Sequence, residues 1–509
     1  MNERNDVALE NKDIKDIKEW LPVFKVSAES DRDLMGYFVK TEYVNAIIGS
    51  DRWLLLGRKG TGKTAIFEYL KNVIPSDANG YYTITLNFKD YPWPIHGLYK
   101  EKMESELTAY QKSWHYLFII QAISKLISIK KTTGTLSSEL EKVEKLLNYI
   151  YGTPSPTAME VIKSKIARIS GLSLPGIDIE TLDLGASLGE ISFEQVAEDI
   201  TLKNKLKSNA FNLLDYLEKV LINNMQNEKI LIILDQLDES WLPSEIPEYS
   251  KILINLINVC RDINTTNKYV NKLKVVPFIR TDIYETLVFN DKNKIYQDSA
   301  TEIHWDEATL DDMFFERIKK YNPADVSLDY SKKTGCVFEI NFVRHGATPL
   351  KHMIRRSFLR PRDIIVYMNK VTEIHTKTKS GLFSSDDLYS AEKDFSISMY
   401  NELIDEWSSQ KPEIRGLLSV LQNIGYQNFN YASFAKAYCE VFPGSDKTKI
   451  EDTLTFLFYN SIVGQKINAN WEYYCGNLRM TIDLKKDFHV SGALKSRLML
   501  TEGMAESTM

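Results

Sequence analysis

A glycine-rich corner at residues 57–64, "GRKGTGKT", constrains this chain more than any other feature of its sequence. It fits the pattern GxxxxGK[ST] in full, with the apolar run "WLLL" at 53–56 before it and a helical pattern at 65–72 after it. Glycines let the backbone curl so that several N–H groups point at one anion, where a Cβ atom would obstruct the approach. A helix that begins at Lys63 adds the positive end of its dipole. The corner therefore predicts a phosphate-binding loop and not a plain glycine turn.

The residue types within this loop predict how it would hold a triphosphate. Lys63 supplies a mobile positive charge for the β- and γ-phosphates, and the Thr64 hydroxyl is placed to ligate Mg²⁺. The backbone around them contributes N–H donors. We therefore expect the nucleotide contacts to come from Gly57, Arg58, Lys59, Gly60, Thr61, Gly62, Lys63, Thr64 and Ala65.

A magnesium-assisted phosphate site also needs a carboxylate that faces the loop, and "ILIILDQLDESW" at 230–241 offers one. Asp235 ends a run of apolar residues, which places it at the carboxyl end of a buried strand. Ligands bind at this edge in open α/β sheets. We therefore predict that Asp235 and Thr64 are the metal ligands.

The residues after Asp235 are candidates for activating the attacking water. One of Gln236, Asp238 and Glu239 should orient or deprotonate it, as phosphoryl transfer generally requires. A solvated helix start is the alternative interpretation of Asp238 and Glu239. The general base stays open among the three.

Apolar runs of strand type alternate with helical patterns along the first 305 residues. Strands are expected at 53–56, 81–88, 229–235 and 272–280, with a possible further strand at 300–305. Helical patterns occupy 65–72, 105–130, 205–227 and 249–263. The alternation implies an α/β fold with a parallel sheet that helices cover on both faces.

Shifts in pattern divide the chain into expected domains. These are an N-terminal helical lead-in (1–50), a P-loop core (51–305) with an insertion (131–204), a helical lid (306–400) and a winged-helix-like domain (401–509). Within the insertion, glycines and alternating apolar residues at 171–195 indicate a hairpin or a flexible subdomain. The winged-helix interpretation follows from two short strands after three helical runs, at 413–424, 430–441 and 447–459.

Composition limits the classes of function. A net charge of -6 and a pI near 5.8 argue against a protein coated in basic surface for nucleic acid. The four cysteines show no CxxC spacing, so we expect buried thiols and neither a cysteine-ligated metal site nor a disulfide framework. The charged first residues do not resemble a signal peptide, and the apolar runs are far shorter than the roughly 20 residues of a membrane helix. We expect a cytoplasmic protein without a membrane partner.

Four stretches in this order, "GRKGTGKT", "LIILDQLDE", "FIRTD" and "RPRDII", resemble AAA+/STAND-type ATPases, and most closely the bacterial FunZ-type P-loop ATPases. The spacing of the first two is similar to the additional-strand division, in which one strand separates the loop strand from the acidic strand. The resemblance implies an ATPase core, a helical lid and a C-terminal winged helix, with ATP and Mg²⁺ as cofactors. It further implies a homo-oligomeric switch or motor that acts on a protein effector or on DNA, in settings that include anti-phage defence.

The resemblance also bears on single residues. At position 236 the family usually has Glu, and here it is Gln, which favours Asp238 or Glu239 as the base, as in STAND-like proteins. The strand next to the acidic one ends in a residue that senses the γ-phosphate in these ATPases, and Arg280 or Thr281 occupies that position. An ordinary Arg–Asp pair is the alternative. For an arginine finger acting in trans, Arg261 and Arg317 are candidates.

The start of a predicted lid helix offers another arginine. Pro361 suits a first helical turn, and Arg360 and Arg362 flank it. Such an arginine could reach the nucleotide and couple hydrolysis to lid rotation, and a basic helix end on the surface is the alternative. The candidate catalytic residues are therefore Lys63, Asp235, Asp238, Glu239, Arg280 and Arg362.

Whether the chain contacts DNA depends on its C-terminal third. Basic residues gather at 341–363, but the expected recognition helix at 447–459 is mostly apolar and carries only Lys447 and Lys449. This favours packing against protein over groove binding. A nucleotide-regulated DNA-binding protein and a P-loop phosphotransferase remain the alternatives to the ATP-driven switch.

Overall fold

The computed structural model describes residues 15–73, 75, 79–89, 106–163, 213–238 and 246–505. Within these ranges the chain forms two compact units. The core unit comprises the described parts of Lys40–Arg58 and Lys63–Ile303, and the C-terminal unit those of Met1–Val39, Lys59–Gly62 and His304–Met509. Four residues of the glycine-rich corner, Lys59–Gly62, thus group with the C-terminal unit.

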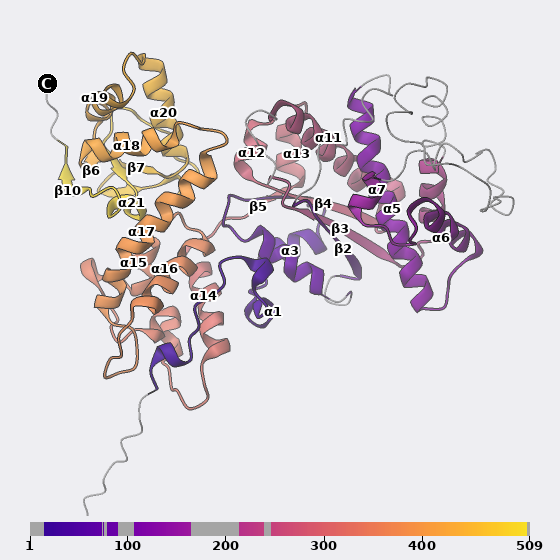
Figure 1. The fold of residues 1–509 in the computed structure, drawn as a ribbon, viewed down its shortest axis with the longest axis horizontal. Coiled ribbons are helices and arrows are strands. Elements are labelled where there is room, and N and C mark those ends of the chain that lie inside the picture. The colour runs from indigo at the N-terminus through magenta and orange to yellow at the C-terminus, as the bar shows by residue number, and fades with distance from the viewer. Residues whose placement is uncertain are drawn as a thin grey trace, which may run out of the picture. The chain divides into compact units, whose positions relative to one another are not determined.

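Five parallel strands in the order β2-β3-β4-β1-β5 form the sheet of the core unit (Figure 1). β4 lies between β1, which leads into the glycine-rich corner, and β3, which ends at Asp235. The order confirms the parallel sheet and the extra strand between the loop strand and the acidic strand. The strands are β1 (Leu54–Leu56), β2 (Tyr81–Asn87), β3 (Lys229–Asp235), β4 (Leu273–Ile279) and β5 (Ala300–Glu302).

Helices cover both faces of this sheet. β3 and β4 are buried along nearly their whole length because apolar residues fill both of their sides. α3 packs on β2 and β3 from one side, and α5 and α11 pack on the other (Figure 1). The described helices are α2 (Glu42–Gly49), α3 (Lys63–Asn72), α5 (Glu106–Thr132), α6 (Ser138–Tyr151), α7 (Ala158–Lys163), 213–224, α11 (Ile246–Thr265), η5 (Asn267–Tyr269), α12 (Thr281–Thr286) and α13 (Lys292–Ser299).

The predicted insertion at 131–204 is helical where the structure describes it. α6 begins after Ser137, whose hydroxyl accepts a hydrogen bond from the Leu140 backbone N–H at 3.2 Å. It ends at Gly152, whose φ of 77° is the usual left-handed stop. The segment 171–195, for which a hairpin or flexible subdomain is predicted, lies outside the described residues.

The first part of the C-terminal unit is helical. α14 starts with a capping box between Asp306 and Thr309, and α17 starts with another between Ser384 and Asp387. Tyr367 of α16 stacks on Phe395 of α17 with ring centroids 4.5 Å apart. The elements are η1 (Ile17–Glu19), η2 (Ala28–Ser30), α1 (Leu34–Tyr37), α14 (Glu307–Tyr321), η6 (Tyr330–Val337), η7 (Arg344–Gly346), α15 (Pro349–Ile354), α16 (Pro361–Ile374) and α17 (Ser385–Trp407).

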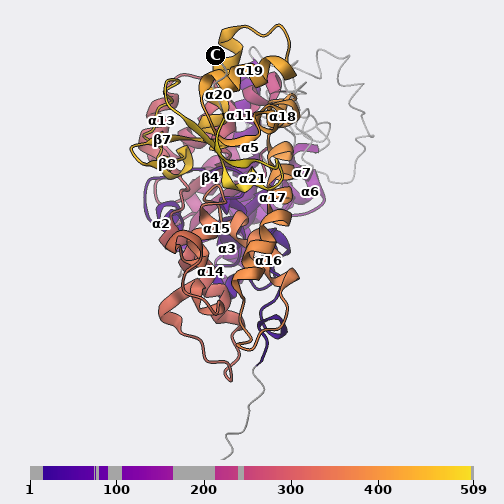
Figure 2. The ribbon, with the colours of Figure 1, turned by 90° about the vertical axis from the view of Figure 1, so that its left-hand side faces the viewer.

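The last part of the unit contains the three predicted helices followed by a β-hairpin of β7 and β8, which belongs to a sheet of order β10-β6-β9-β7-β8. In Figure 2, α14 to α16 lie below, α18 to α20 above, and α17 between them. The elements are α18 (Ile414–Ile424), β6 (Tyr426–Phe429), α19 (Tyr431–Val441), α20 (Lys447–Tyr459), β7 (Val463–Ile467), β8 (Asn470–Glu472), η8 (Tyr474–Gly476), β9 (Phe488–Val490), α21 (Gly492–Lys495) and β10 (Thr501–Met504).

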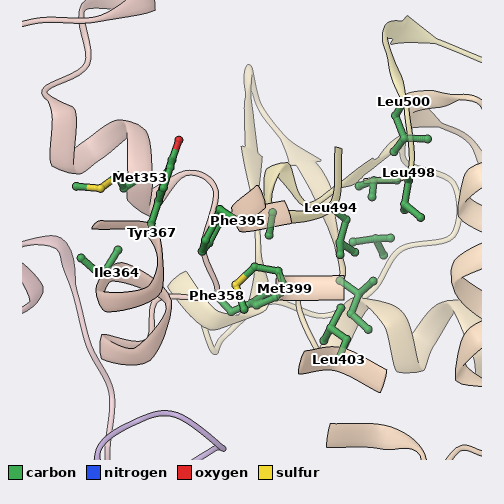
Figure 3. Packing of buried hydrophobic residues seen from close by; sticks show 14 of the residues in the cluster. Met353, Phe358, Ile364, Tyr367, Phe395, Met399, Leu403, Leu494, Leu498 and Leu500 are labelled. Carbon is green, nitrogen blue, oxygen red and sulfur yellow. The ribbon is translucent and has the colours of Figure 1, made fainter. Parts of the chain in front are cut away.

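One hydrophobic core runs through the C-terminal unit, and α17 lies at its centre. Phe395, Met399 and Leu403 project from α17 into this core, which continues to Leu494 and Leu498 near the chain's end (Figure 3). A helix that is buried by elements before and after it in the chain is held firmly in rotation about its own axis. The direction in which its polar side chains point is fixed in the same way.

The predicted helical lead-in is interrupted. Phe38 is extended, with φ -64° and ψ 121°, so that α1 ends at Tyr37 and α2 begins only at Glu42. The two short helices bury their apolar residues in different units, α1 in the C-terminal unit and α2 in the core unit. In the described ranges, none of the helices has the length and apolar character needed to cross a membrane.

Candidate functional site

The glycine-rich corner is tied to the neighbouring strand at its first residue. Gly57 donates its N–H to the Ile279 carbonyl of β4 at 3.3 Å, and its own carbonyl accepts from the Thr281 N–H at 3.4 Å. Further along, Gly60 and Gly62 have φ values of 82° and 96°, which side-chain-bearing residues rarely adopt. A Cβ atom on Gly62 would meet no atom within 4 Å. The loop backbone at this point borders open space, as a cradle for an anion requires.

Lys63 is the first residue of α3, as predicted, and its side chain folds back along the loop. Its Nζ donates to the carbonyls of Gly57 at 2.8 Å and Arg58 at 3.2 Å. Burial lowers the pKa of Lys63, while the carboxylates of Asp238 and Asp235 act in the opposite direction. A phosphate oxygen would be a charged acceptor and thus a stronger partner than these two carbonyls.

Asp235 and Thr64 have the environment of a cation site. Asp235 is 3% exposed at the end of β3 and forms a side-chain hydrogen bond with Thr64. Its Oδ2 is buried without a hydrogen-bond partner in the ranges that the structure describes. Burial raises the pKa of Asp235 to about 6, although Thr64 and Lys63 act to lower it. A buried, unsatisfied carboxylate oxygen is costly, so the pair fits a hard divalent cation such as Mg²⁺.

Arg280 follows β4 and is engaged by two carboxylates. Its Nε and Nη2 donate to Asp282 at 3.1 and 2.7 Å, and its Nη1 lies 3.4 Å from Oδ2 of Asp238. The Arg280–Asp282 pair foreseen as an alternative is therefore present, and the candidate base Asp238 is a second partner of Arg280. Thr281 instead donates its hydroxyl to Glu302 of β5 at 2.8 Å. The structure thus brings Arg280 and Asp238 together from the ends of two adjacent strands.

The stretch after Asp235 carries backbone strain. Gln236 has a φ of 61°, in the left-handed region that glycine favours. Such strain in side-chain-bearing residues concentrates at functional sites, where the surrounding fold enforces it. Glu239 lies outside the described residues, so that Asp238 is the acidic candidate whose surroundings are known.

Arg360 lies in the C-terminal unit, where it caps α16, and Pro361 occupies the first turn as predicted. It is 4% exposed. Its Nε donates to Asp363 at 3.1 Å, and its Nη1 donates to Glu406 at 2.9 Å and to the Lys59 carbonyl at 3.1 Å. The alternative interpretation, a basic helix end on the surface, does not hold for Arg360, because its side chain is buried.

Arg362, like Arg360, contacts the loop segment Lys59–Gly62. Its backbone N–H donates to the Gly60 carbonyl at 3.4 Å. Its Nη1 lies 2.7 Å from Oε1 of Glu402, and Nζ of Lys59 lies 3.4 Å from that same oxygen. Both cations are half-buried. One carboxylate of α17 therefore forms ion pairs with both a loop lysine and Arg362.

The two arginine-finger candidates differ in exposure. Arg317 is 7% exposed and lies over the ring of Tyr37 at 4.5 Å, where it forms part of the core of the C-terminal unit. The side chain of Arg261 is 35% exposed and pairs with Asp262 and Asp291. Of the two, Arg261 is therefore the residue whose side chain another molecule could contact.

Sequence reasoning anticipates Asp282 as the partner of Arg280 in an ordinary Arg–Asp pair, but it does not identify Glu402 and Glu406. Glu402 and Glu406 do leave a signal, because they continue the helical spacing of the apolar residues Phe395 and Met399. A carboxylate at a core position predicts a buried cation as its partner.

Comparison with known proteins adds a family match in the C-terminal unit. Residues 308–404 match the model of the FunZ-associated C-terminal helical domain. The match confirms the resemblance to FunZ-type proteins over this region. The chain is also 22% identical over 413 residues to the putative transposon gamma-delta 80.3 kDa protein of Escherichia coli (strain K12). That alignment covers 79% of this chain and 54% of the relative, so the chain spans about half the length of the curated relative it matches.

Solved structures resemble the chain more distantly. They include the Aeropyrum pernix ORC1 protein in complex with DNA (13% identity, TM-score 0.35, 94% of this chain and 93% of that one). Two others are the Aeropyrum pernix ORC2 protein in ADPNP-ADP complexes (13%, 0.41, 92% and 96%) and Cdc6p from Pyrobaculum aerophilum (12%, 0.30, 92% and 98%). Scores at this level add nothing to the chain's own strand order. This chain has a P-loop NTPase core of additional-strand topology and, over residues 308–404, a region similar to the FunZ-associated C-terminal helical domain.

Proposed function

We propose that the chain binds ATP with Mg²⁺ at residues 57–64 and hydrolyses it, and that it works as a molecular switch or motor of AAA+/STAND type. One observation carries this proposal. Lys63, Thr64, Asp235 and Arg280 gather in the core unit at the carboxyl edge of a parallel sheet whose order sets β4 between β1 and β3. Open α/β sheets bind their ligands at this edge.

Each residue of the site would have its own task. Backbone N–H groups of the loop and Lys63 would hold the phosphates, and Thr64 and Asp235 would hold Mg²⁺, which acts as a Lewis acid on the phosphate oxygens. Asp238 would orient or deprotonate the attacking water, a task that Gln236 and Glu239 could share. Arg280 would bind the γ-phosphate, and Arg362 would stabilise its charge.

The C-terminal unit would pass the nucleotide state to a partner. We assign residues 306–400 as a lid and 401–509 as a winged-helix-like domain. The ring of Phe456 on α20 packs edge-on against Trp407 of α17 at 4.8 Å, which supports a helix that packs against protein and not one that reads a DNA groove. Self-assembly through the core, an effector protein and a role in bacterial anti-phage defence complete the proposal, and they follow from the FunZ resemblance alone.

ATP hydrolysis by the full chain tests the site. Lys63→Ala and Asp235→Ala should each lower the rate by about 100-fold or more, since each removes a charge that contacts the triphosphate or its metal. Lys71→Ala is the matched control, because Lys71 lies on the same helix α3 with its side chain 50% exposed. Native mass measurement with a non-hydrolysable ATP analogue would report assembly. Hydrolysis at the parent rate in both site variants would overturn the proposal.

A further inference from the structure

Glu402 occupies a position that an apolar residue would ordinarily fill. Phe395, Met399, Glu402 and Glu406 follow one another at spacings of four, three and four residues, so they share one face of α17. Phe395 and Met399 are buried in the core of the C-terminal unit (Figure 3). The core thereby fixes the rotation of the helix and directs both carboxylates to the residues around the N-terminus of α16.

Six charged side chains meet there, and their formal charges cancel. Lys59, Arg360 and Arg362 face Asp363, Glu402 and Glu406. The two carboxylates of α17, Glu402 and Glu406, form ion pairs with different cations. Glu406 pairs with Arg360, which is 4% exposed. Glu402 is 21% exposed and pairs with Lys59 and Arg362, which are 27% and 28% exposed. The ion pair of Glu406 with Arg360 therefore resembles a pair in a protein core. The ion pairs of Glu402 are partly accessible to water.

We propose that Glu402 is a built-in competitor of the nucleotide: its carboxylate takes up the positive charge of Lys59 and Arg362 that a bound triphosphate would otherwise use. Lys59 belongs to the phosphate-binding loop, and the backbone of Arg362 donates to Gly60 of that loop. An anion that binds at Lys59–Gly62 would therefore lie near the negative charge of Glu402. The formal charges of the six-residue cluster sum to zero, so an added anion would give it an excess of negative charge.

The geometry supports exchange of partners. Lys59 and Arg362 both contact the single oxygen Oε1 of Glu402, so that one carboxylate rotation would free two cations. The Nε of Arg362 is buried without a hydrogen-bond partner among the described residues, so one donor of this guanidinium is available for another acceptor. The positive surroundings of Arg362 and Lys59 hold the pKa of Glu402 below its ordinary value despite its burial, so Glu402 keeps its charge at neutral pH.

This inference deepens the proposed ATP binding and depends on it. Removing the competing charge should strengthen binding, whereas removing a merely structural ion pair should weaken it or leave it unchanged. Glu402→Gln keeps the size of the side chain and should tighten the Kd for ATP by about three- to ten-fold at low salt. The gain should shrink in about 0.5 M salt, since the charges are partly exposed.

Asp405→Asn is the matched control. Asp405 lies on α17 as well and is exposed, so the substitution removes the same formal charge from the same helix without touching Lys59 or Arg362. The probes are ATP and ADP, each with and without Mg²⁺, in equilibrium binding to the full chain. The gain in Glu402→Gln should be largest for Mg²⁺-free ATP, which carries the most negative charge, and smallest for Mg²⁺-bound ADP.

The outcomes separate this inference from the proposed function. If the parent chain binds no nucleotide, or if Lys63→Ala binds it equally well, the proposed site is wrong. If the parent chain binds ATP and Glu402→Gln binds it no more tightly than Asp405→Asn does, Glu402 is not a competitor of the nucleotide. The proposed nucleotide site would be unaffected by that result. Thermal unfolding shows whether Glu402→Gln is folded, and Glu402→Ala replaces it if it is not, with the same expected gain.

Discussion

Arg280, at the end of β4, and Asp238, just after β3, form an ion pair with Nη1 and Oδ2 3.4 Å apart. The pair joins two residues on neighbouring strands for which the sequence predicts phosphate sensing and water activation. Asp282 holds Arg280 more closely, at 2.7 Å, and fixes the direction of its guanidinium. The charge of Asp238 is therefore partly neutralised by the residue proposed to bind the γ-phosphate.

Asp238→Asn should lower kcat for ATP hydrolysis by about 10- to 1,000-fold while the Kd for ATP stays within about two-fold of the parent value, because the base acts only in the chemical step. Steady-state hydrolysis and equilibrium binding measure the two quantities. The Glu239→Gln variant is the comparison. A full loss of turnover in that variant, with normal turnover in Asp238→Asn, would move the base to Glu239.

Asp235 should make the ligand-free protein less stable as the pH rises. Its pKa is about 6 in the folded chain against 3.8 for the ordinary group, so the folded state binds the proton more tightly. Stability from this residue is complete below about pH 4 and is lost as the pH rises through about 6. At pH 7.5, Asp235→Asn should therefore raise the free energy of unfolding by roughly 1–3 kcal/mol.

Thermal unfolding between pH 4 and 8, without nucleotide or metal, measures this effect. Asp298→Asn, at an exposed position of the core unit, is the control and should follow the parent at every pH. A lower melting temperature for Asp235→Asn at pH 7.5 would show that the carboxylate is stabilising as it stands.

Asp363→Ala should destabilise the C-terminal unit by about 3–5 kcal/mol, because it leaves the guanidinium of Arg360 short of a buried partner. Asp363 is fully buried and also accepts the Phe358 N–H at 2.8 Å. Denaturant unfolding gives the difference. Asp394→Ala, at an exposed position of α17, should stay within about 0.5 kcal/mol of the parent.

Lys447 and Lys449 should not support DNA binding. Both are exposed at the start of α20, while Ile450, Leu454, Leu457 and Phe458 of that helix are buried. If the chain is retained on DNA at all, the double substitution to alanine should leave the affinity and its salt slope unchanged. A slope that becomes shallower by about one to two units would show that these lysines contact phosphates, and the DNA-binding alternative would gain support.

The phosphate loop and the strand before Asp235 were predictable because their signals are local. A glycine spacing specifies a backbone curl, and an apolar run that ends in aspartate specifies a buried strand with a polar edge, whatever lies elsewhere in the chain. The same holds for Pro361 at the start of α16. Each of these features is confined to fewer than about ten residues, within reach of pattern reasoning.

What only the tertiary structure decided is which distant residues meet. Asp238 and Arg280 are 42 residues apart, and Arg360 meets the Lys59 carbonyl across 301 residues. No local pattern encodes such pairings, because they depend on strand order and on the rotation of α17 that its apolar neighbours impose. For this reason the sequence alone identified the cations of the site and the local pair of Arg280 with Asp282, and it missed the distant carboxylates Glu402 and Glu406.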